Sequence, residues 1–386
     1  MPAQLPALFL RTVLNGCFDP AALDEAATLA ARPDFSWPAV LTVAAEQGLL
    51  PLLYGLLGRQ TWVPEDGRRQ LQQAYTVGRL YHRLLRDELG RLLQRFRTSA
   101  VPVLVLKGAA LAETVYPDPA WRPLHDMDLL VPPETVTTVM AFLAQEGYRP
   151  TAPEVAPGII RAYESQIALT PTRPLPFGLE VHWHLFDSPH HQRVIPMDWF
   201  WQTCRPLALA AGEACMLGPE AQLLHLGAHL WLHHRGRGLL WQFDLVMLLH
   251  ALADRLDWDA VVHRAAVYDL VLSTRYVLNG LATLWQAPVP ATVLARLGAL
   301  SPSPAERRTV ARLTAAHRPV LYRFWSDLLA LPTWSARLRY AWFNLFPVPA
   351  YMRERYGISR SYLLPFYYLY RWYRGMRGAL SRRQKR

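Results

Sequence analysis

Two aspartates that lie two residues apart in an apolar run, Asp126 and Asp128, constrain this chain more than any other feature. Residues i and i+2 of a β-strand project from one face of a sheet, so residues 125–131 predict a strand with two neighbouring carboxylates. Such carboxylates repel each other, and buried acids without partners are costly. A divalent metal relieves that repulsion, and Mg²⁺ prefers oxygen ligands. The alternative is a solvated pair at the end of a strand.

A third acid, Glu180, lies in another apolar stretch of strand character, where Glu180, His182 and His184 alternate onto one face. We expect Glu180 to act as a metal ligand or as a general base on an acceptor hydroxyl. Taken alone, a single acid in a strand is more often a surface residue. The interpretation therefore depends on the Asp126–Asp128 pair.

The Lys107-Gly108 turn precedes the aspartates and follows the β-rich segment 101–106. A strand, a turn and a helix in this order can present backbone N–H groups to an anion. Lys107 would bind a triphosphate as a point charge, and Arg122 has a similar standing. The alternatives are a solvated lysine and an ion pair of Arg122 with Asp118 or Glu113.

Residues 103–131 resemble a bacterial family known as uncharacterised nucleotidyltransferase, within the polymerase-beta-like nucleotidyltransferase superfamily. The shared motifs are a Leu-Lys-Gly turn at 106–108, Tyr-Pro-Asp-Pro at 116–119, an Arg-Pro at 122–123 and Asp-x-Asp-Leu-Leu-Val at 126–131. The likeness continues through 179–184, through 223–249 with its Trp-Gln-Phe-Asp, and to the tail at 346–353. Ala109 departs from the superfamily, which usually has a serine or glycine after the turn glycine. Backbone N–H groups and Lys107 would therefore contact the phosphates.

The resemblance implies an enzyme that moves an NMP from an NTP to a hydroxyl group and releases pyrophosphate. Its cofactor would be Mg²⁺ (or Mn²⁺), held by Asp126, Asp128 and Glu180, with Lys107, Gly108 and Arg122 at the nucleotide. The resemblance specifies neither the acceptor nor the nucleobase of the NTP, so ATP is one candidate among the NTPs. The alternative is a catalytically weak or inactive protein of this fold that partners a membrane-associated biosynthetic assembly.

The pattern of elements predicts an α+β fold, with a small mixed-sheet nucleotidyltransferase core between N- and C-terminal helical regions. We expect helices in residues 1–100, the catalytic core in 101–218, helices again in 219–333 and a basic aromatic tail in 334–386. Residues 68–97 predict one long amphipathic helix. Residues 132–147 predict a helix with prolines at its start and a glycine at its end.

The positive charge of the chain is concentrated in its tail. Residues 334–386 hold twelve Arg and Lys and one acid, whereas residues 1–333 hold 29 basic and 29 acidic residues. The tail also holds 14 of the 44 aromatic residues. Basic residues beside interfacial aromatics suit an anionic membrane surface, and aromatic and basic residues in alternation also suit RNA. We rank a helical tail that packs on the body and also contacts a membrane surface first, and nucleic acid second.

The expected location is the cytoplasm, with peripheral contact at the inner face of the membrane. Cys17, Cys204 and Cys215 are odd in number and scattered, which fits a reducing compartment. No apolar run is long enough to span a membrane, and residues 1–11 do not resemble a signal peptide.

Three histidines, His225, His229 and His233, lie at i, i+4 and i+8 of a predicted helix, and therefore on one face. His-x-x-x-His is a zinc-ligand spacing. No cysteine or acid lies at an obvious fourth position, so we favour a polar stripe that packs toward the cleft or the acidic strands. We expect His125 to lie next to the aspartates and to contact the metal ligands rather than the metal.

Overall fold

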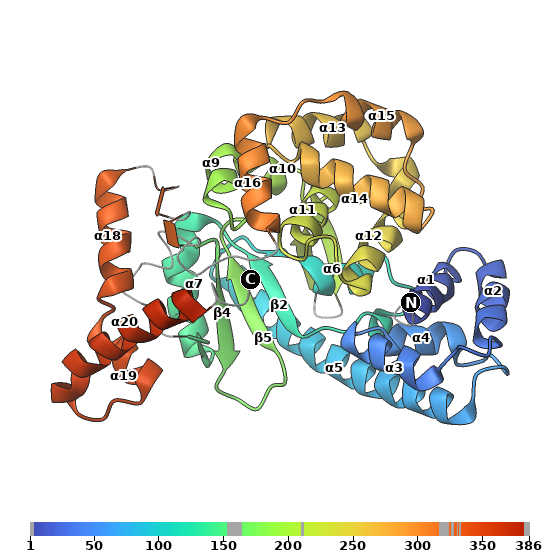
Figure 1. Ribbon diagram of the computed structural model, residues 1–386, viewed down its shortest axis with the longest axis horizontal. Helices are drawn as coiled ribbons and strands as arrows, with labels where there is room; N and C mark the ends of the chain where they lie inside the picture. The colour runs from blue at the N-terminus through green and yellow to red at the C-terminus, as the bar shows by residue number, and fades with distance from the viewer. Residues whose placement is uncertain are drawn as a thin grey trace.

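The computed structural model describes residues 4–152, 164–209, 212–315, 324–325, 328–329, 331 and 333–381. Its elements confirm the α+β class, with a mixed sheet between two sets of helices (Figure 1). The helices before the sheet are α1 (Gln4–Asn15), α2 (Ala21–Ala30), α3 (Trp37–Glu46), α4 (Leu50–Leu57) and α5 (Glu65–Thr98). The predicted long amphipathic helix is α5, whose leucines at 85, 89 and 92 are buried.

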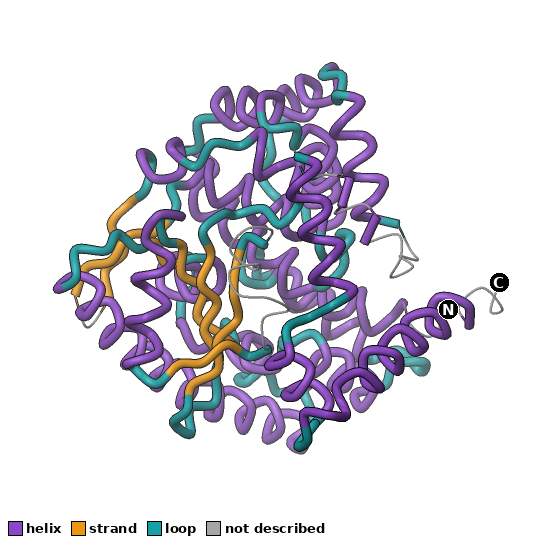
Figure 2. The backbone as a smooth tube through the Cα atoms, turned by 90° about the vertical axis from the view of Figure 1, so that its left-hand side faces the viewer, coloured by secondary structure: helices purple, strands orange, loops and turns teal. Residues whose placement is uncertain are grey.

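A seven-stranded sheet in the order β3-β4-β5-β2-β1-β7-β6 follows these helices, and its strands are drawn in orange in the left half of Figure 2. Its two inner pairs, β2–β5 and β1–β7, are parallel, and the other neighbours are antiparallel. The strands are β1 (Leu104–Val105), β2 (Asp126–Leu130), β3 (Tyr148–Pro150), β4 (Gln166–Pro171), β5 (Gly178–His182), β6 (Arg205–Leu209) and β7 (Gly212–Met216). The sequence did not indicate the hairpin of β6 and β7.

Short helices connect the strands: α6 (Lys107–Thr114), η1 (Pro119–Trp121), η2 (Pro133–Thr135), α7 (Val136–Gln145), α9 (Pro189–Val194) and α10 (Asp198–Gln202). The predicted helix after β2 is confirmed as η2 and α7. It begins after a proline pair and ends before Gly147, whose φ of 83° suits only a residue without a Cβ.

Opposite faces of β2 meet different surroundings. Met127 and Leu129 lie in a core with leucines of α5 and α7. Because strand residues alternate, Asp126 and Asp128 project from the other face, toward the C-terminal helices. Burial of the apolar face therefore fixes which way the two carboxylates point.

The C-terminal helices are α11 (Pro219–Leu232), α12 (Leu239–Leu252), η3 (Ala253–Arg255), α13 (Trp258–Val267), α14 (Val271–Leu284), α15 (Ala291–Ala299) and α16 (Pro304–Thr314). They share one hydrophobic core with the N-terminal helices. Phe9 and Leu53 of the N-terminal set lie in the same buried cluster as Phe243 and Leu297. The two helical regions therefore share one buried cluster, while the boundaries at residues 100, 218 and 333 stay predictions.

The tail forms α18 (Trp334–Leu345), α19 (Pro349–Tyr356), η4 (Ser361–Leu363) and α20 (Leu364–Ser381). In Figure 1 these helices lie on the side of the molecule opposite to α1 and α2. Within the described ranges, no helix combines the length and apolar character that crossing a membrane requires.

Candidate active site

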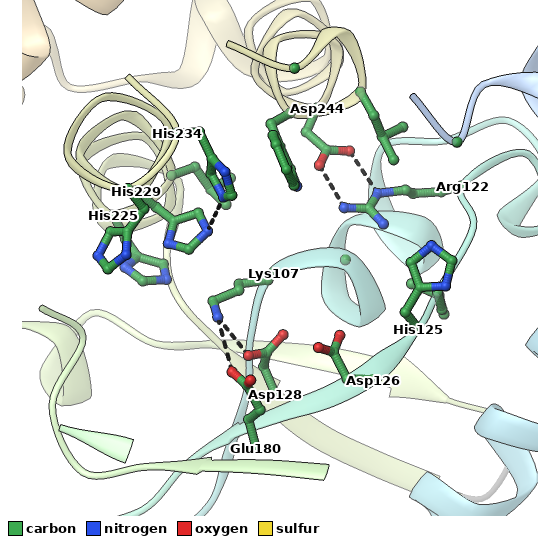
Figure 3. Close-up of a pocket in the computed structure, with 18 of the residues that line it drawn as sticks. Lys107, Arg122, His125, Asp126, Asp128, Glu180, His225, His229, His234 and Asp244 are labelled. Atoms are coloured by element: carbon green, nitrogen blue, oxygen red, sulfur yellow. Dashed lines mark hydrogen bonds and ion pairs between the residues drawn. The ribbon is translucent and has the colours of Figure 1, made fainter. Parts of the chain in front are cut away.

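A pocket of about 670 Å³ lies between the sheet, the start of α6, and helices α11 and α12 (Figure 3). This volume is within the range of small-molecule sites. Residues 45–48, at the end of α3, also line it, so the N-terminal region contributes a wall. All six residues that the sequence singled out line this pocket: Asp126, Asp128, Glu180, Lys107, Gly108 and Arg122.

The register of two parallel strands brings the acids together. Asp128 on β2 pairs with Glu180 on β5, and Asp126 pairs with Gly178. Paired residues on neighbouring strands project from the same face, so the three carboxylates converge although more than fifty residues separate Asp128 from Glu180. Gln166 of β4 extends the row by donating a hydrogen bond to Glu180 at 3.0 Å.

Lys107 enters the acidic cluster from the start of α6. The backbone N–H of Leu106 donates to the carbonyl of Asp128 at 2.9 Å, which ties the turn to β2. Lys107 itself has a φ of 48°, an uncommon conformation for a residue with a side chain. Its Nζ lies 2.6 Å from Oδ1 of Asp128 and 3.7 Å from Oε2 of Glu180. Burial lowers the pKa of this ammonium, but the carboxylates, Asp128 foremost, raise it overall.

His182 approaches the same carboxylates from β5. Its Nε2 lies 2.8 Å from Oδ1 of Asp128 and 3.5 Å from Oε2 of Glu180. Burial favours a neutral Asp128, yet Lys107 and His182 hold the pKa of that carboxyl well below its usual range. Burial and Lys107 lower the pKa of His182, but Asp128 and Glu180 raise it overall. Asp128 is therefore ionised between the ammonium of Lys107 and the imidazole of His182.

Asp126 differs from its neighbour. Its carboxylate makes no hydrogen bond or ion pair with any residue that the structure describes, and burial, Asp128 and Glu180 raise its pKa to about 6. The pocket thus carries more negative charge than Lys107 and His182 neutralise. A raised carboxyl pKa of this origin indicates a place where an additional cation would be stabilised.

Gly108 is required by the packing of Arg122. A Cβ on Gly108 would lie 2.9 Å from Nη1 of Arg122 and 3.0 Å from its Cζ, which is too close. Arg122 is buried and donates through Nε and Nη2 to the carboxylate of Asp244 at 3.0 and 2.8 Å. Its partner is thus neither Asp118 nor Glu113. A direct contact of Arg122 with a nucleotide stays a prediction.

A row of histidines from α11 forms the wall opposite the acidic strands. His225, His229 and His233 line the pocket together with His234, so the predicted polar stripe faces the cleft. Burial and Lys107 lower the pKa of His225 and His229 well below the usual value. Nε2 of His229 lies 3.0 Å from Nε2 of His234. His125 is exposed. It directly precedes β2 and lies at the rim of the pocket beside Asp126 (Figure 3).

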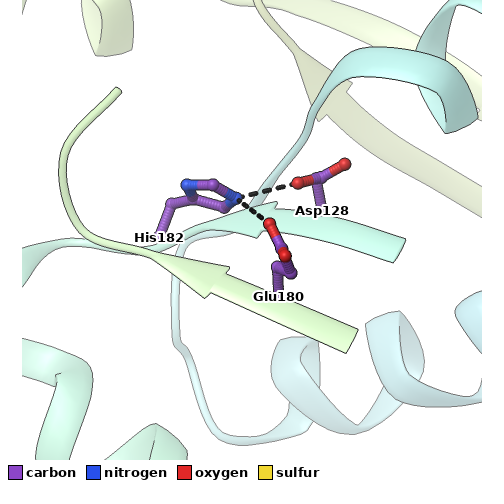
Figure 4. Close-up of side chains that lie close together, drawn as sticks. All are labelled: Asp128, Glu180 and His182. Atoms are coloured by element: carbon purple, nitrogen blue, oxygen red, sulfur yellow. Dashed lines mark hydrogen bonds and ion pairs between the residues drawn. The ribbon is translucent and has the colours of Figure 1, made fainter. Parts of the chain in front are cut away.

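One set of side chains in the described part of the chain has the spacing of a metal site. Oδ1 or Oδ2 of Asp128, a carboxylate oxygen of Glu180 and a ring nitrogen of His182 lie within 4.8 Å of one another (Figure 4). Two carboxylates and an imidazole are suitable ligands for a divalent ion. The residues present therefore fit a divalent metal ion, although His182 replaces Asp126 in this compact group.

Sequence reasoning gave no role to two residues that the structure places in or beside the site. His182 was assigned to the face of Glu180, and the alternation 180–182 was the signal that could have included it. Asp244 belongs to the Trp-Gln-Phe-Asp motif, but its partner Arg122 is 122 residues away, and no local pattern indicates such a pair.

Comparisons with known proteins complete the description of the site. A family model described as "Uncharacterised nucleotidyltransferase" matches residues 33–286, which include all six predicted site residues. No curated protein sequence matches. Among solved structures, the chain is similar to an antigenic nucleotidyltransferase-like protein from Paracoccidioides brasiliensis, with 14% sequence identity and a TM-score of 0.34. That match covers 54% of this chain and 95% of the other.

Proposed function

Because the chain belongs to the uncharacterised nucleotidyltransferase family, we propose that it is a metal-dependent enzyme that moves an NMP from an NTP to an acceptor hydroxyl. We propose further that it is a member of the polymerase-beta-like superfamily, because an Asp-x-Asp strand and a third acidic strand follow its glycine turn. The observation that carries the proposal is the convergence of Asp126, Asp128 and Glu180 from two parallel strands in one pocket. Carboxylates so arranged are what phosphoryl-transfer chemistry with a divalent metal requires.

In this proposal the three carboxylates hold Mg²⁺ (or Mn²⁺), which, when bound, neutralises phosphate charge and polarises the α-phosphate. Lys107 provides a second positive charge at the triphosphate, and Gly108 lets the backbone at the start of α6 approach the phosphates. Arg122 supports the turn from behind Gly108. Two of its three guanidinium nitrogens, Nε and Nη2, donate to the carboxylate of Asp244.

The protein groups then account for each atom of the transfer. Glu180 aligns the acceptor hydroxyl and takes its proton. The hydroxyl oxygen forms a bond to the α-phosphorus, the bond between that phosphorus and the bridging oxygen breaks, and pyrophosphate leaves. The pocket volume of about 670 Å³ is enough for a nucleotide and a small acceptor group.

The test is incubation of the protein with each α-labelled NTP, a divalent metal and cell extract. We expect one class of acceptor to take up label, and no uptake with Asp128→Asn, which keeps shape but removes charge. Absence of label from every NTP, with the protein folded, would favour the alternative of a non-catalytic binding protein.

Glu180→Gln separates catalysis from binding. If Glu180 acts on the acceptor, the variant should lose transfer by on the order of 10²-fold or more while NTP binding changes far less. Transfer is measured as label taken up by the acceptor that the labelling experiment finds, and NTP binding is measured separately. Gln166→Ala is the control for loss of the hydrogen bond to Glu180. Normal transfer by Glu180→Gln would remove Glu180 from the mechanism.

We also propose that the protein is cytoplasmic and contacts an anionic membrane surface through α18 to α20. Large apolar side chains are exposed on these helices. They are Trp334, Leu338, Trp342, Leu345, Tyr362, Phe366, Leu369, Tyr370 and Tyr373. Arginines accompany them, and an anionic surface complements that charge.

The membrane proposal is tested by co-sedimentation with anionic vesicles. We expect binding at low salt and release at high salt, because exposed charges are screened over about 8 Å at physiological salt. Neutralising Arg382, Arg383, Lys385 and Arg386, which lie outside the described residues, should reduce binding and leave NTP binding intact. The control neutralises the exposed Arg59, Arg69, Arg79 and Arg83. RNA binding with a steep salt dependence, and no vesicle binding, would favour nucleic acid instead.

A further inference from the structure

His182 has the position of a metal ligand rather than of a supporting side chain. It is 2% exposed, it follows Glu180 by two residues on β5, and its Nε2 edge faces both carboxylates (Figure 4). The distances from Nε2 to Oδ1 of Asp128 and Oε2 of Glu180 are 2.8 and 3.5 Å. We propose that His182 binds the divalent ion through Nε2 beside Asp128 and Glu180, and that the site therefore prefers Mn²⁺ to Mg²⁺.

The spacing allows all three groups to reach one ion. Their ligand atoms lie within 4.8 Å of one another. Ligand atoms that are about 2.0–2.2 Å from a common ion can be roughly 4.3 Å apart at most, so a shift of about half an ångström is sufficient. This set differs from the three carboxylates of the proposed function, because it contains a nitrogen and excludes Asp126 from the compact group.

Lys107 supports the assignment by its competing position. Its ammonium approaches the same two oxygen atoms, Oδ1 of Asp128 and Oε2 of Glu180, at 2.6 and 3.7 Å. The ammonium of Lys107 and the imidazole of His182 thus converge on one pair of oxygens. The side chain of Lys107 is flexible and lines the pocket, so it can turn toward a phosphate when an ion takes its place.

A second observation in the same pocket points to a ligand. His225 on α11 is 2% exposed, and neither of its ring nitrogens has a hydrogen-bond partner in the part of the chain that the structure describes. Buried polar atoms without partners are rare in folded proteins and call for an explanation. His225 lies near enough to His182, Asp128 and Lys107 to interact with each electrostatically. A substrate atom or ion-bound group in the pocket would provide its missing partner.

The nitrogen determines which ion the site prefers. Mg²⁺ is bound almost entirely by oxygen atoms, whereas imidazole suits ions of the first transition series. Mn²⁺ accepts carboxylate oxygens as Mg²⁺ does and also tolerates a nitrogen, so it matches two carboxylates with one imidazole. This inference rests on the proposed function only for the role of the ion, since the ion can bind whether or not a nucleotide is transferred.

The experiment measures ion binding by the full chain without nucleotide. Mn²⁺ binding is counted by electron paramagnetic resonance, Mg²⁺ affinity is obtained by competition, and pulsed measurements detect nitrogen coupled to bound Mn²⁺. We expect Mn²⁺ to bind at least about tenfold more tightly than Mg²⁺, with an imidazole nitrogen coupled to it. Equal affinities, or bound Mn²⁺ without coupled nitrogen, would overturn the proposal.

Substitutions assign the nitrogen to His182. His182→Gln keeps a donor for Asp128 but removes the ring, so it should eliminate the nitrogen coupling and weaken Mn²⁺ binding by on the order of tenfold or more. The control is His263→Gln, an exposed histidine of α13 outside the pocket lining. Nitrogen coupling that persists in folded His182→Gln would point to another histidine and contradict the proposal.

Two further arrangements keep the test decisive. If His182→Gln does not fold, His182→Asn and wild-type protein labelled with ¹⁵N-histidine replace it. If Mn²⁺ binds through His182 but no NTP gives labelled product, the inference stands and the proposed function fails. If nucleotide is transferred with Mg²⁺ but bound Mn²⁺ shows no coupled nitrogen, the proposed function stands and the inference about His182 fails.

Discussion

Two buried charge clusters border the same pocket, and they differ in how completely their charges are matched. The first, the Arg122 cluster, consists of Arg122, Asp244 and Tyr116. The carboxylate of Asp244 accepts two bonds from Arg122 and one from the Tyr116 hydroxyl at 2.7 Å. One cation meets one anion, and the cluster joins the segment before β2 to α12.

The second, the Asp128 cluster, consists of Asp126, Asp128, Glu180, Lys107 and His182. It contains three carboxylates for one lysine and one histidine, and Asp126 has no partner within the described ranges. Both clusters are buried by the same fold, so burial alone does not distinguish structure from function. The difference in charge balance does, because a matched cluster stabilises the fold while an unmatched one favours a ligand.

The largest effect is expected for Arg122→Leu. Removing the cation leaves Asp244 buried and unpaired, which should lower the free energy of unfolding by about 3–5 kcal/mol. Urea denaturation measures this loss, and divalent metal should not restore it. The control, Arg32→Leu, breaks a solvent-exposed pair with Asp34 and should leave the free energy of unfolding nearly unchanged. A loss that Mn²⁺ reverses would place Arg122 in the ligand site.

Lys107→Met should cause an intermediate loss of stability, and this loss, unlike that of Arg122→Leu, should be reversed by metal. Without metal, the loss of a charged hydrogen bond to Asp128 should lower the free energy of unfolding by about 1.5–3 kcal/mol. Millimolar Mn²⁺ should recover most of that loss, because an ion takes the place of the ammonium. Thermal unfolding with chelator and with Mn²⁺ gives the comparison. If metal raises the Tm of the variant no more than that of the wild type, the two clusters are not different in kind.

Asp126→Asn should give the smallest change, a gain. The pKa of Asp126 is raised to about 6, so the folded protein holds a proton that the unfolded chain has already released. Its contribution to stability therefore falls as pH rises from about 4 to about 6. The variant lacks this loss and should be more stable than wild type by on the order of 1 kcal/mol above pH 6, with little difference near pH 4. Denaturation at both pH values, without metal, tests the sign.

The local sequence predicted some of these features because they depend on neighbours along the chain. Helix α5 follows from an apolar face at helical spacing, and the common face of Asp126 and Asp128 follows from strand alternation. The prediction that Glu180 joins these two aspartates came from the family resemblance, since no local pattern specifies that β2 pairs with β5.

Other features depend on pairings between distant segments. The β6–β7 hairpin, which contains Pro206 and Glu213, lacks a clear apolar alternation, and β7 joins the sheet by pairing with β1 more than a hundred residues earlier. The contact of His182 with Asp128 likewise requires the parallel register of β2 and β5. The sequence predicted which residues of β2 and β5 share a face, but not that these two strands are neighbours.

The hydrophobic core that the first and last helical regions share has a consequence for synthesis. Phe18 stacks on His250, and the backbone N–H of Leu239 donates to Gln47, so the N-terminal helices lack these partners until some two hundred further residues have been made. At about 5–20 residues per second, an interval of about 200 residues lasts roughly 10–40 s. The apolar surface that α12 finally covers is therefore open on the nascent chain during that interval.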